Sequence, residues 1–187
     1  MSTPQEITIR SVDRFEEPAF TELVDAILHD PDRRAVAERW FGGATAAAPA
    51  RAGLHQVRVG AFEGELLVGW SHAWLLPGGV LHVGNSGVQP QRRRRGVYTR
   101  LVAAIEDEAR ALGCLRVESQ HRAGNSAVLI AKLKAGYTIV GTEFSAEMGL
   151  LLKMCKQLEP RRDAVFRARL GTLEGVVRSF GPGPARP

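Results

Sequence analysis

One segment of the chain combines residue types that could bind a phosphate-bearing ligand. An apolar stretch ends in Val88-Gln89-Pro90, the basic loop Arg92–Gly96 follows, and a helical pattern begins at Val97. A strand, a basic loop that contains glycine, and a helix together direct backbone N–H groups toward one point. The sequence therefore predicts a pyrophosphate-binding site in this loop.

A second segment could form the opposite wall of the same groove. It begins about thirty residues further on with Asn125, continues as an apolar-rich helix and ends in Gly136-Tyr137. Each segment alone is weak evidence for a ligand-binding site. The two segments together, in this order and at this spacing, are strong evidence.

The first segment resembles the fingerprint of the GNAT superfamily of N-acetyltransferases. The family loop, Arg/Gln-x-x-Gly-x-Gly/Ala, corresponds here to Arg93, Gly96 and Tyr98. The resemblance covers roughly residues 5–158. One position departs from the pattern, because Tyr98 places a bulky side chain where the family has a small residue beside the phosphates.

The second segment carries the other family signature, Asn-x-x-Ala, then a Tyr, then Gly-Phe. Here it reads Asn125, Val128, Lys132 and Gly136-Tyr137. Lys132 therefore stands where the family often has the tyrosine that protonates the departing thiolate.

The resemblance implies acetyl-CoA as co-substrate and no metal. Its pantetheine arm would lie between the strands expected at residues 80–88 and 115–119, which splay apart in this family. The cofactor-binding residues implied are Val88, Arg93, Arg94, Arg95, Gly96, Val97, Tyr98 and Asn125. Alternatives stay open for three kinds of position: the arginines other than Arg93 could be solvated, Gly96 could be an ordinary turn glycine, and Asn125 could only cap its helix.

Direct transfer of an acetyl group requires a base, because the acceptor amine carries a proton at neutral pH. We take His82 as the candidate, since its ordinary pKa suits that role and several related enzymes have Glu or His at this place. Strand alternation predicts His82, Gly84 and Ser86 on one face. His72 and Trp74 would join His82 if the hairpin register allows it; the alternative for each is a structural role.

The candidates for the group that meets the departing thiolate are Lys132 and Tyr98. Lys132 could donate a proton only if its pKa were lowered; otherwise it is a lysine on the helix surface. Tyr137 occupies the position of a core Phe and is expected to pack. His121 could touch a ligand, but it is expected in a surface loop after the strand.

Composition fits one soluble domain. The chain has 187 residues, a net charge of +5 and two cysteines without CxxC spacing, which we expect to be buried free thiols in the cytoplasm. No apolar run is long enough to span a bilayer. The run Arg92–Arg95 permits a nucleic-acid interpretation, but no aromatic residues interleave it, and a phosphate-bearing cofactor explains the same charge.

The elements that position these residues follow from periodicity and turn residues. We expect a strand at 6–10, helices from about residue 13 to 28 and at 34–41, a loop at 42–53, and strands at 56–62, 66–75 and 80–88. A helix at 97–112, a strand at 115–119, a helix after Asn125, and strands at 137–142 and 148–158 follow. This order predicts a mixed α/β or α+β fold, in which helices cover both faces of a mostly antiparallel sheet of about seven strands.

Residues 1–158 are predicted to form the catalytic domain, and residues 159–187 a C-terminal extension with a helix within 161–177 and a Gly/Pro-rich tail.

The resulting hypothesis is an acetyl-CoA-dependent N-acetyltransferase that acts by direct attack of a primary amine of a small molecule or peptide. A GNAT-fold protein that binds CoA without catalysis, as a sensor or partner module, is the alternative. The sequence leaves open the acceptor, the acyl length, and whether the chain is a monomer or a homodimer.

Overall fold

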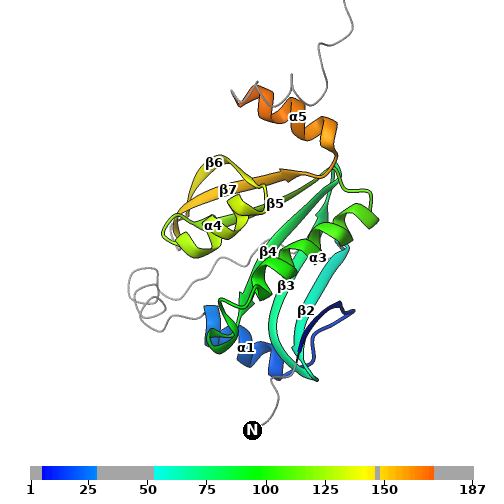
Figure 1. Cartoon of the computed structure of the whole chain (residues 1–187), viewed down its shortest axis with the longest axis vertical. Coiled ribbons are helices and arrows are strands. Elements are labelled where there is room, and N and C mark those ends of the chain that lie inside the picture. The colour runs from blue at the N-terminus through cyan, green and yellow to red at the C-terminus, as the bar shows by residue number, and fades with distance from the viewer. Residues whose placement is uncertain (1–5, 29–52, 146–147, 171–187) are drawn as a thin grey trace, which may run out of the picture.

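The computed structural model describes residues 6–28, 53–145 and 148–170, which build one seven-stranded mixed sheet in the order β1-β2-β3-β4-β5-β7-β6 (Figure 1). The strands are β1 (Ile7–Ser11), β2 (Gln56–Glu63), β3 (Leu66–Leu76), β4 (Val80–Val88), β5 (Arg116–Arg122), β6 (Thr138–Ser145) and β7 (Gly149–Gln157). Strands β4 and β5 pair in parallel, and the other adjacent pairs are antiparallel. The predicted fold class is confirmed.

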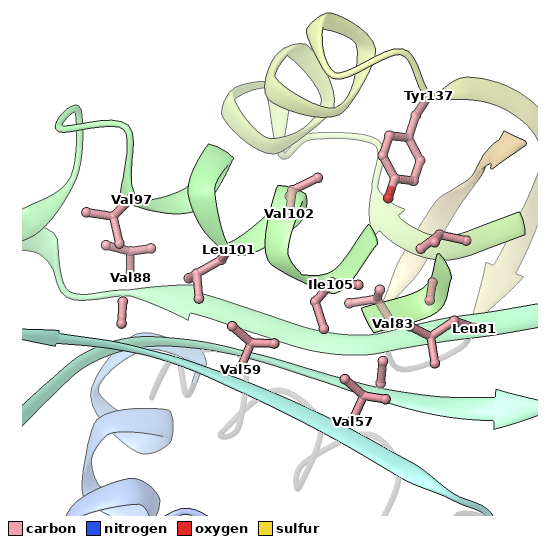
Figure 2. Packing of buried hydrophobic residues seen from close by; sticks show 14 of the residues in the cluster. Val57, Val59, Leu81, Val83, Val88, Val97, Leu101, Val102, Ile105 and Tyr137 are labelled. Carbon is pink, nitrogen blue, oxygen red and sulfur yellow. The ribbon is translucent and has the colours of Figure 1, made fainter. Parts of the chain in front are cut away.

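The helix α3 (Val97–Ala111) connects β4 to β5 and covers one face of the sheet (Figure 1). Its buried residues include Val97, Leu101 and Ile105. Val97 lies over Val88 at one end of β4, and Ile105 lies beside Val83 toward the other end (Figure 2). These helix residues recur at intervals of four, so one stripe of the helix faces the sheet.

The other face of the sheet is covered by α1 (Ala19–Leu28). Trp70 of β3 is fully buried there and packs against Leu23 and Phe20. Phe15 is also buried and stacks on Phe20, with the ring centroids 4.3 Å apart, although it precedes the helix. The helix therefore begins later than the sequence predicted.

Three further helical segments complete the described part: the short η1 (Pro90–Arg92), α4 (Ser126–Lys134) and α5 (Pro160–Arg169). Arg167 of α5 donates a hydrogen bond to the carbonyl of Gly136 (3.0 Å), so this helix lies against the end of α4. The division into residues 1–158 and 159–187 stays a prediction. The predicted helix at 34–41, almost all of the loop at 42–53, and the tail fall outside the described residues.

The two cysteines are confirmed as buried free thiols, since Cys114 and Cys155 are 7% and 3% exposed. Within the described ranges, no helix is long and apolar enough to cross a membrane. The edge strand β6 exposes Ile139, Val140 and Phe144, the last of them 78% exposed. Such a surface suits a partner chain, but a homodimer stays a prediction.

Candidate functional site

A cleft opens through the sheet where β4 and β5 separate. The two strands pair only from Val80 to Val83 and from Arg116 to Ser119, and beyond that point they diverge. The cleft between them has a volume of about 750 Å³ and is lined by residues of β3, β4, β5, α1, α3, α4 and the start of β7. The splay that the family resemblance implied is therefore present.

The loop before α3 offers unpaired backbone N–H groups. Arg94 and Gly96 both adopt left-handed backbone conformations, with φ of 60° and 74°. No acceptor among the described residues receives the N–H groups of Arg94, Arg95 or Gly96, and the first turn of α3 adds the orphan N–H groups of a helix start. A Cβ at Gly96 would meet no atom within 4 Å, so the space above the glycine is open. This concave arrangement fits an anion such as a pyrophosphate.

The arginines of the loop have different partners. Arg92 forms two hydrogen bonds to the Glu63 carboxylate, one of them from Nε at 2.9 Å, and Arg95 lies 3.9 Å from the same carboxylate. Arg93 donates from Nε to the carbonyl of Val88 (3.0 Å). Three of the four arginines thus help to hold the loop against β2 and β4.

Two further predicted cofactor residues flank the cleft. Tyr98, in the first turn of α3, lines it, and burial raises the pKa of the Tyr98 phenol above its usual range. Asn125 also lines the cleft and caps α4, since its Oδ1 accepts the N–H of Val128 at 3.4 Å. The predicted cap is confirmed. Val88 and Val97 are buried in the core, which leaves their backbone groups as the ones that could face a ligand.

A β-bulge in β4 changes the predicted faces of this strand. The register pairs Trp74 with His82 and His72 with Asn85, so Gly84 is an extra residue without a partner. A Cβ at Gly84 would lie 1.9 Å from the Trp74 ring, which explains the glycine.

The prediction that Ser86 shares a face with His82 is therefore wrong. Ser86 hydrogen-bonds Ser71 at 2.8 Å on the α3 side of the sheet. Asn85 instead joins His82 on the α1 side, where it accepts a hydrogen bond from Trp70 Nε1 (2.7 Å).

The predicted grouping of His72, Trp74 and His82 on one side is confirmed by the register. The rings of His72 and Trp74 lie 4.2 Å apart, and Trp74 and His82 both line the cleft. The α1 side of the cleft is thus walled by an indole and an imidazole. No carboxylate is among the described residues that line the cleft.

Lys132 is not a surface lysine, and that interpretation was wrong. Its side chain is 1% exposed, and its ammonium lies 3.9 Å from the centroid of the Tyr137 ring. Burial lowers the pKa of Lys132 to about 7, an effect that the Glu106 carboxylate opposes and the Lys156 ammonium increases. Tyr137 is buried as expected (Figure 2).

His121 lies in β5 and not in a surface loop, because the strand continues to Arg122. It lines the cleft, and its Nε2 lies 2.9 Å from Ser119 Oγ. Burial, followed by the charge of Lys132, lowers the pKa of His121 to about 4, so the imidazole is neutral at pH 7. Val117, Ser119 and His121 alternate along the sequence, and this pattern could have placed the predicted end of the strand beyond residue 119.

The sequence model of the Acetyltransferase (GNAT) family matches residues 12–132. This range contains the cleft strands, the loop before α3 and most of α4. No curated protein is significantly similar to the chain in sequence.

Solved structures resemble the fold at low sequence identity. The ribosomal-protein-S18-alanine N-acetyltransferase of Escherichia coli is 14% identical, with a TM-score of 0.63, over 82% of this chain and 95% of the other. A chain of the NatC complex bound to Gag peptide and CoA is 19% identical, with a TM-score of 0.62, over 82% and 99%. A Bacillus subtilis acetyltransferase in complex with CoA is 13% identical, with a TM-score of 0.59, over 82% and 100%.

Proposed function

The chain belongs to the acetyltransferase (GNAT) family, and we propose that it transfers an acetyl group from acetyl-CoA to a primary amine of a small molecule or peptide. The observation that carries this proposal is the cleft between β4 and β5, which lies beside the loop before α3, where three N–H groups find no acceptor in the described part of the chain. A ligand with a pyrophosphate and a long arm that ends in a reactive group matches such a site.

The positions of the loop and of the convergence point indicate how an extended ligand would lie in the site. The N–H groups of Arg94, Arg95 and Gly96 lie beyond the carboxyl end of β4 and would hold the pyrophosphate. The arm would then run toward the point where β4 and β5 converge, at Val83 and Ser119. This point lies about 16 Å from Val88, at 3.3 Å per strand residue. The thioester would therefore lie near the convergence point.

The acceptor amine would approach from the α1 side. On β4, His82 directly precedes Val83, the residue at the convergence point. Its side chain lies on the α1 side and lines the cleft together with Trp74. We assign His82 as the base that takes the amine proton. The enzyme's remaining contribution is to align the amine with the thioester carbonyl, since the attack is direct.

The test is a calorimetric titration of acetyl-CoA into the protein and two matched variants. Gly96→Ala and Gly113→Ala lie at opposite ends of α3; both glycines have positive φ, 74° and 69°, and neither Cβ would meet an atom within 4 Å. Each should cost about 1 kcal/mol of stability through backbone strain. Only Gly96→Ala should weaken acetyl-CoA binding, because only its methyl group would project toward the phosphates. Gly96→Asp, which adds a negative charge, should abolish binding.

Absence of acetyl-CoA binding by folded protein would refute the proposal, and so would equal binding by Gly96→Asp and the wild type. Once binding is established, a panel of primary amines tests transfer. The alternative is a GNAT-fold protein that binds CoA without chemistry, and the bulk of Tyr98 in the cleft is compatible with it. Acetylated product from any amine in the panel excludes that alternative.

A further inference from the structure

A buried group of charges lies behind one wall of the cleft. Glu106 of α3 is 5% exposed, and its Oε2 lies 2.6 Å from Lys156 Nζ. Lys132 of α4 is 1% exposed, and both lysines lie over the Tyr137 ring, at 3.9 and 5.9 Å from its centroid. We call Glu106, Lys132, Tyr137 and Lys156 the buried cluster. Fully buried lysines are rare because burial disfavours the charged form, so this position needs an explanation.

The cluster carries more positive than negative charge. One carboxylate, Glu106, forms ion pairs with the ammonium of Lys156 at 2.6 Å and with the guanidinium of Arg110 at 3.5 Å. Its charge also acts on Lys132, with which no ion pair is formed among the described residues. Glu106 Oε1 and the Tyr137 hydroxyl are buried and have no hydrogen-bond partner among the described residues. The cluster is therefore not a closed network, and its positive charge is only partly neutralised.

His121 connects the cluster to the cleft. It lines the cleft, whereas Lys132 is not among the described residues that do so. The charge of Lys132 acts on His121 and contributes to keeping its imidazole neutral. A neutral imidazole retains one N–H donor, and when Nε2 accepts the hydroxyl proton of Ser119 that donor is Nδ1–H, which the ring can present without carrying a charge of its own.

We propose that His121 donates a hydrogen bond to the sulfur of CoA as it departs, and that Lys132 acts through His121 as a positioning residue whose charge stabilises the thiolate. This inference rests on the proposed function, because it requires CoA in the cleft. The sulfur would lie near the convergence point of β4 and β5, which is at Ser119 on β5. His121 is two residues further along the same strand.

The step balances without a further reactant. The amine nitrogen forms a bond to the acetyl carbon, the carbon–sulfur bond breaks, and the sulfur keeps the electron pair. The protonated amine gives up two protons, one before the attack and one from the nitrogen once the bond to carbon has formed, and both leave through His82 to water. His121 keeps its proton throughout, so no acid has to be recharged.

The groups that face Lys132 come from every neighbouring element. These are Glu106 of α3, His121 of β5, Tyr137 before β6 and Lys156 of β7. Tyr98 of α3 and Cys155 of β7 act on Tyr137, whose pKa both raise. Burial, and to a smaller extent the charge of Glu106, raises the pKa of Tyr137, so its phenol stays neutral. Lys132 is therefore the group of the buried cluster that can change its charge near pH 7.

The experiment measures the pKa of the thiol of bound CoA from the ultraviolet absorbance of its thiolate. The blank is the complex with desulfo-CoA, which lacks the sulfur and cancels the absorbance of tyrosines and cysteines. In the wild type the bound thiol should ionise about one to three pKa units below free CoA, the range expected for a nearby opposite charge. In Lys132→Met the thiol pKa should return to within about half a unit of free CoA.

Two variants separate this effect from a change of structure. Lys134→Met removes an exposed lysine from the same helix and should leave the lowered thiol pKa unchanged. His121→Phe keeps Lys132 but removes the N–H donor, and it should raise the thiol pKa part of the way.

A bound thiol that ionises like free CoA, or one equally shifted in Lys132→Met, would overturn the inference while leaving the proposed function intact. Failure of CoA to bind the wild type would overturn both.

Discussion

Replacement of Lys132 by methionine should remove a specific pH dependence of stability. In the folded chain the pKa of Lys132 is lowered from its usual 10.5 to about 7, chiefly by burial. Between these two values the unfolded chain binds one proton more than the folded chain does. Unfolding then takes up a proton, so the free energy of unfolding of the wild type rises with pH in this window.

The size of the effect follows from the shift. One proton corresponds to about 1.4 kcal/mol per pH unit, and the folded lysine is half protonated at about pH 7. The wild type should therefore gain roughly 1–2 kcal/mol between about pH 7 and about pH 8.5. His121, with its pKa lowered to about 4, makes stability rise with pH below this window, up to its usual 6.5. The raised pKa values of Cys114 and Cys155 oppose the rise only near and above their usual value of 9.0.

Urea denaturation at three pH values across the window measures this gain. In Lys132→Met the slope should disappear, while Glu106 keeps Lys156 at 2.6 Å as its partner. In Lys134→Met, which changes an exposed lysine of α4, the slope should persist. An equal slope in Lys132→Met and the wild type would show that Lys132 does not titrate near pH 7, and the reasoning about the buried cluster would fail.

Three other substitutions have defined outcomes. His82→Gln should lower kcat about 100-fold or more with the acetylated amine and remove the acidic limb of the pH–rate profile, while calorimetry shows unchanged acetyl-CoA affinity. Gly84→Ala should displace the Trp74 ring, which the new Cβ would approach to 1.9 Å, and raise KM for the amine; an unchanged KM would mean that Trp74 does not contact the acceptor. Arg167→Ala should destabilise the fold by about 1 kcal/mol in urea denaturation, because it leaves the Gly136 carbonyl without its donor; no loss would indicate that α5 does not hold the end of α4 in solution.

The loop before α3 could be predicted because its signals are local. Val88, Gly96 and the apolar stripe from Val97 lie within one strand–loop–helix unit, and their residue types determine the turn and the buried face. The turn residues Pro77-Gly78-Gly79 also predicted where the hairpin of β3 and β4 turns, and therefore its approximate register. These elements require no knowledge of distant residues.

The faces of β4 could not be predicted, because strand alternation assumes an uninterrupted pairing. The bulge at Gly84 depends on the Trp74 ring of the neighbouring strand and reverses the face of every later residue. Ser86 therefore lies on the opposite side from the one that its spacing to His82 implies.

The burial of Lys132 had a different cause. On α4 the apolar Ile130 and Leu133 are 52% and 47% exposed, while the lysine between them is buried. Residue type alone predicts the reverse arrangement. The surroundings that accept this lysine, the Tyr137 ring and the charge of Glu106, which is 26 residues earlier in the chain, come together only in the folded structure and cannot be read from the sequence of α4.

The burial of both cysteines has a practical consequence for assays. Reagents that detect free thiols need access to the sulfur, and Cys114 and Cys155, the only cysteines of the chain, are almost entirely enclosed. Burial also raises the pKa of each thiol, so little of either is in the reactive thiolate form. A colorimetric thiol reagent added to the folded protein should therefore report released CoA with little background. The same reagent in denaturant should count two thiols per chain, which gives each assay an internal measure of the fraction of protein that is folded.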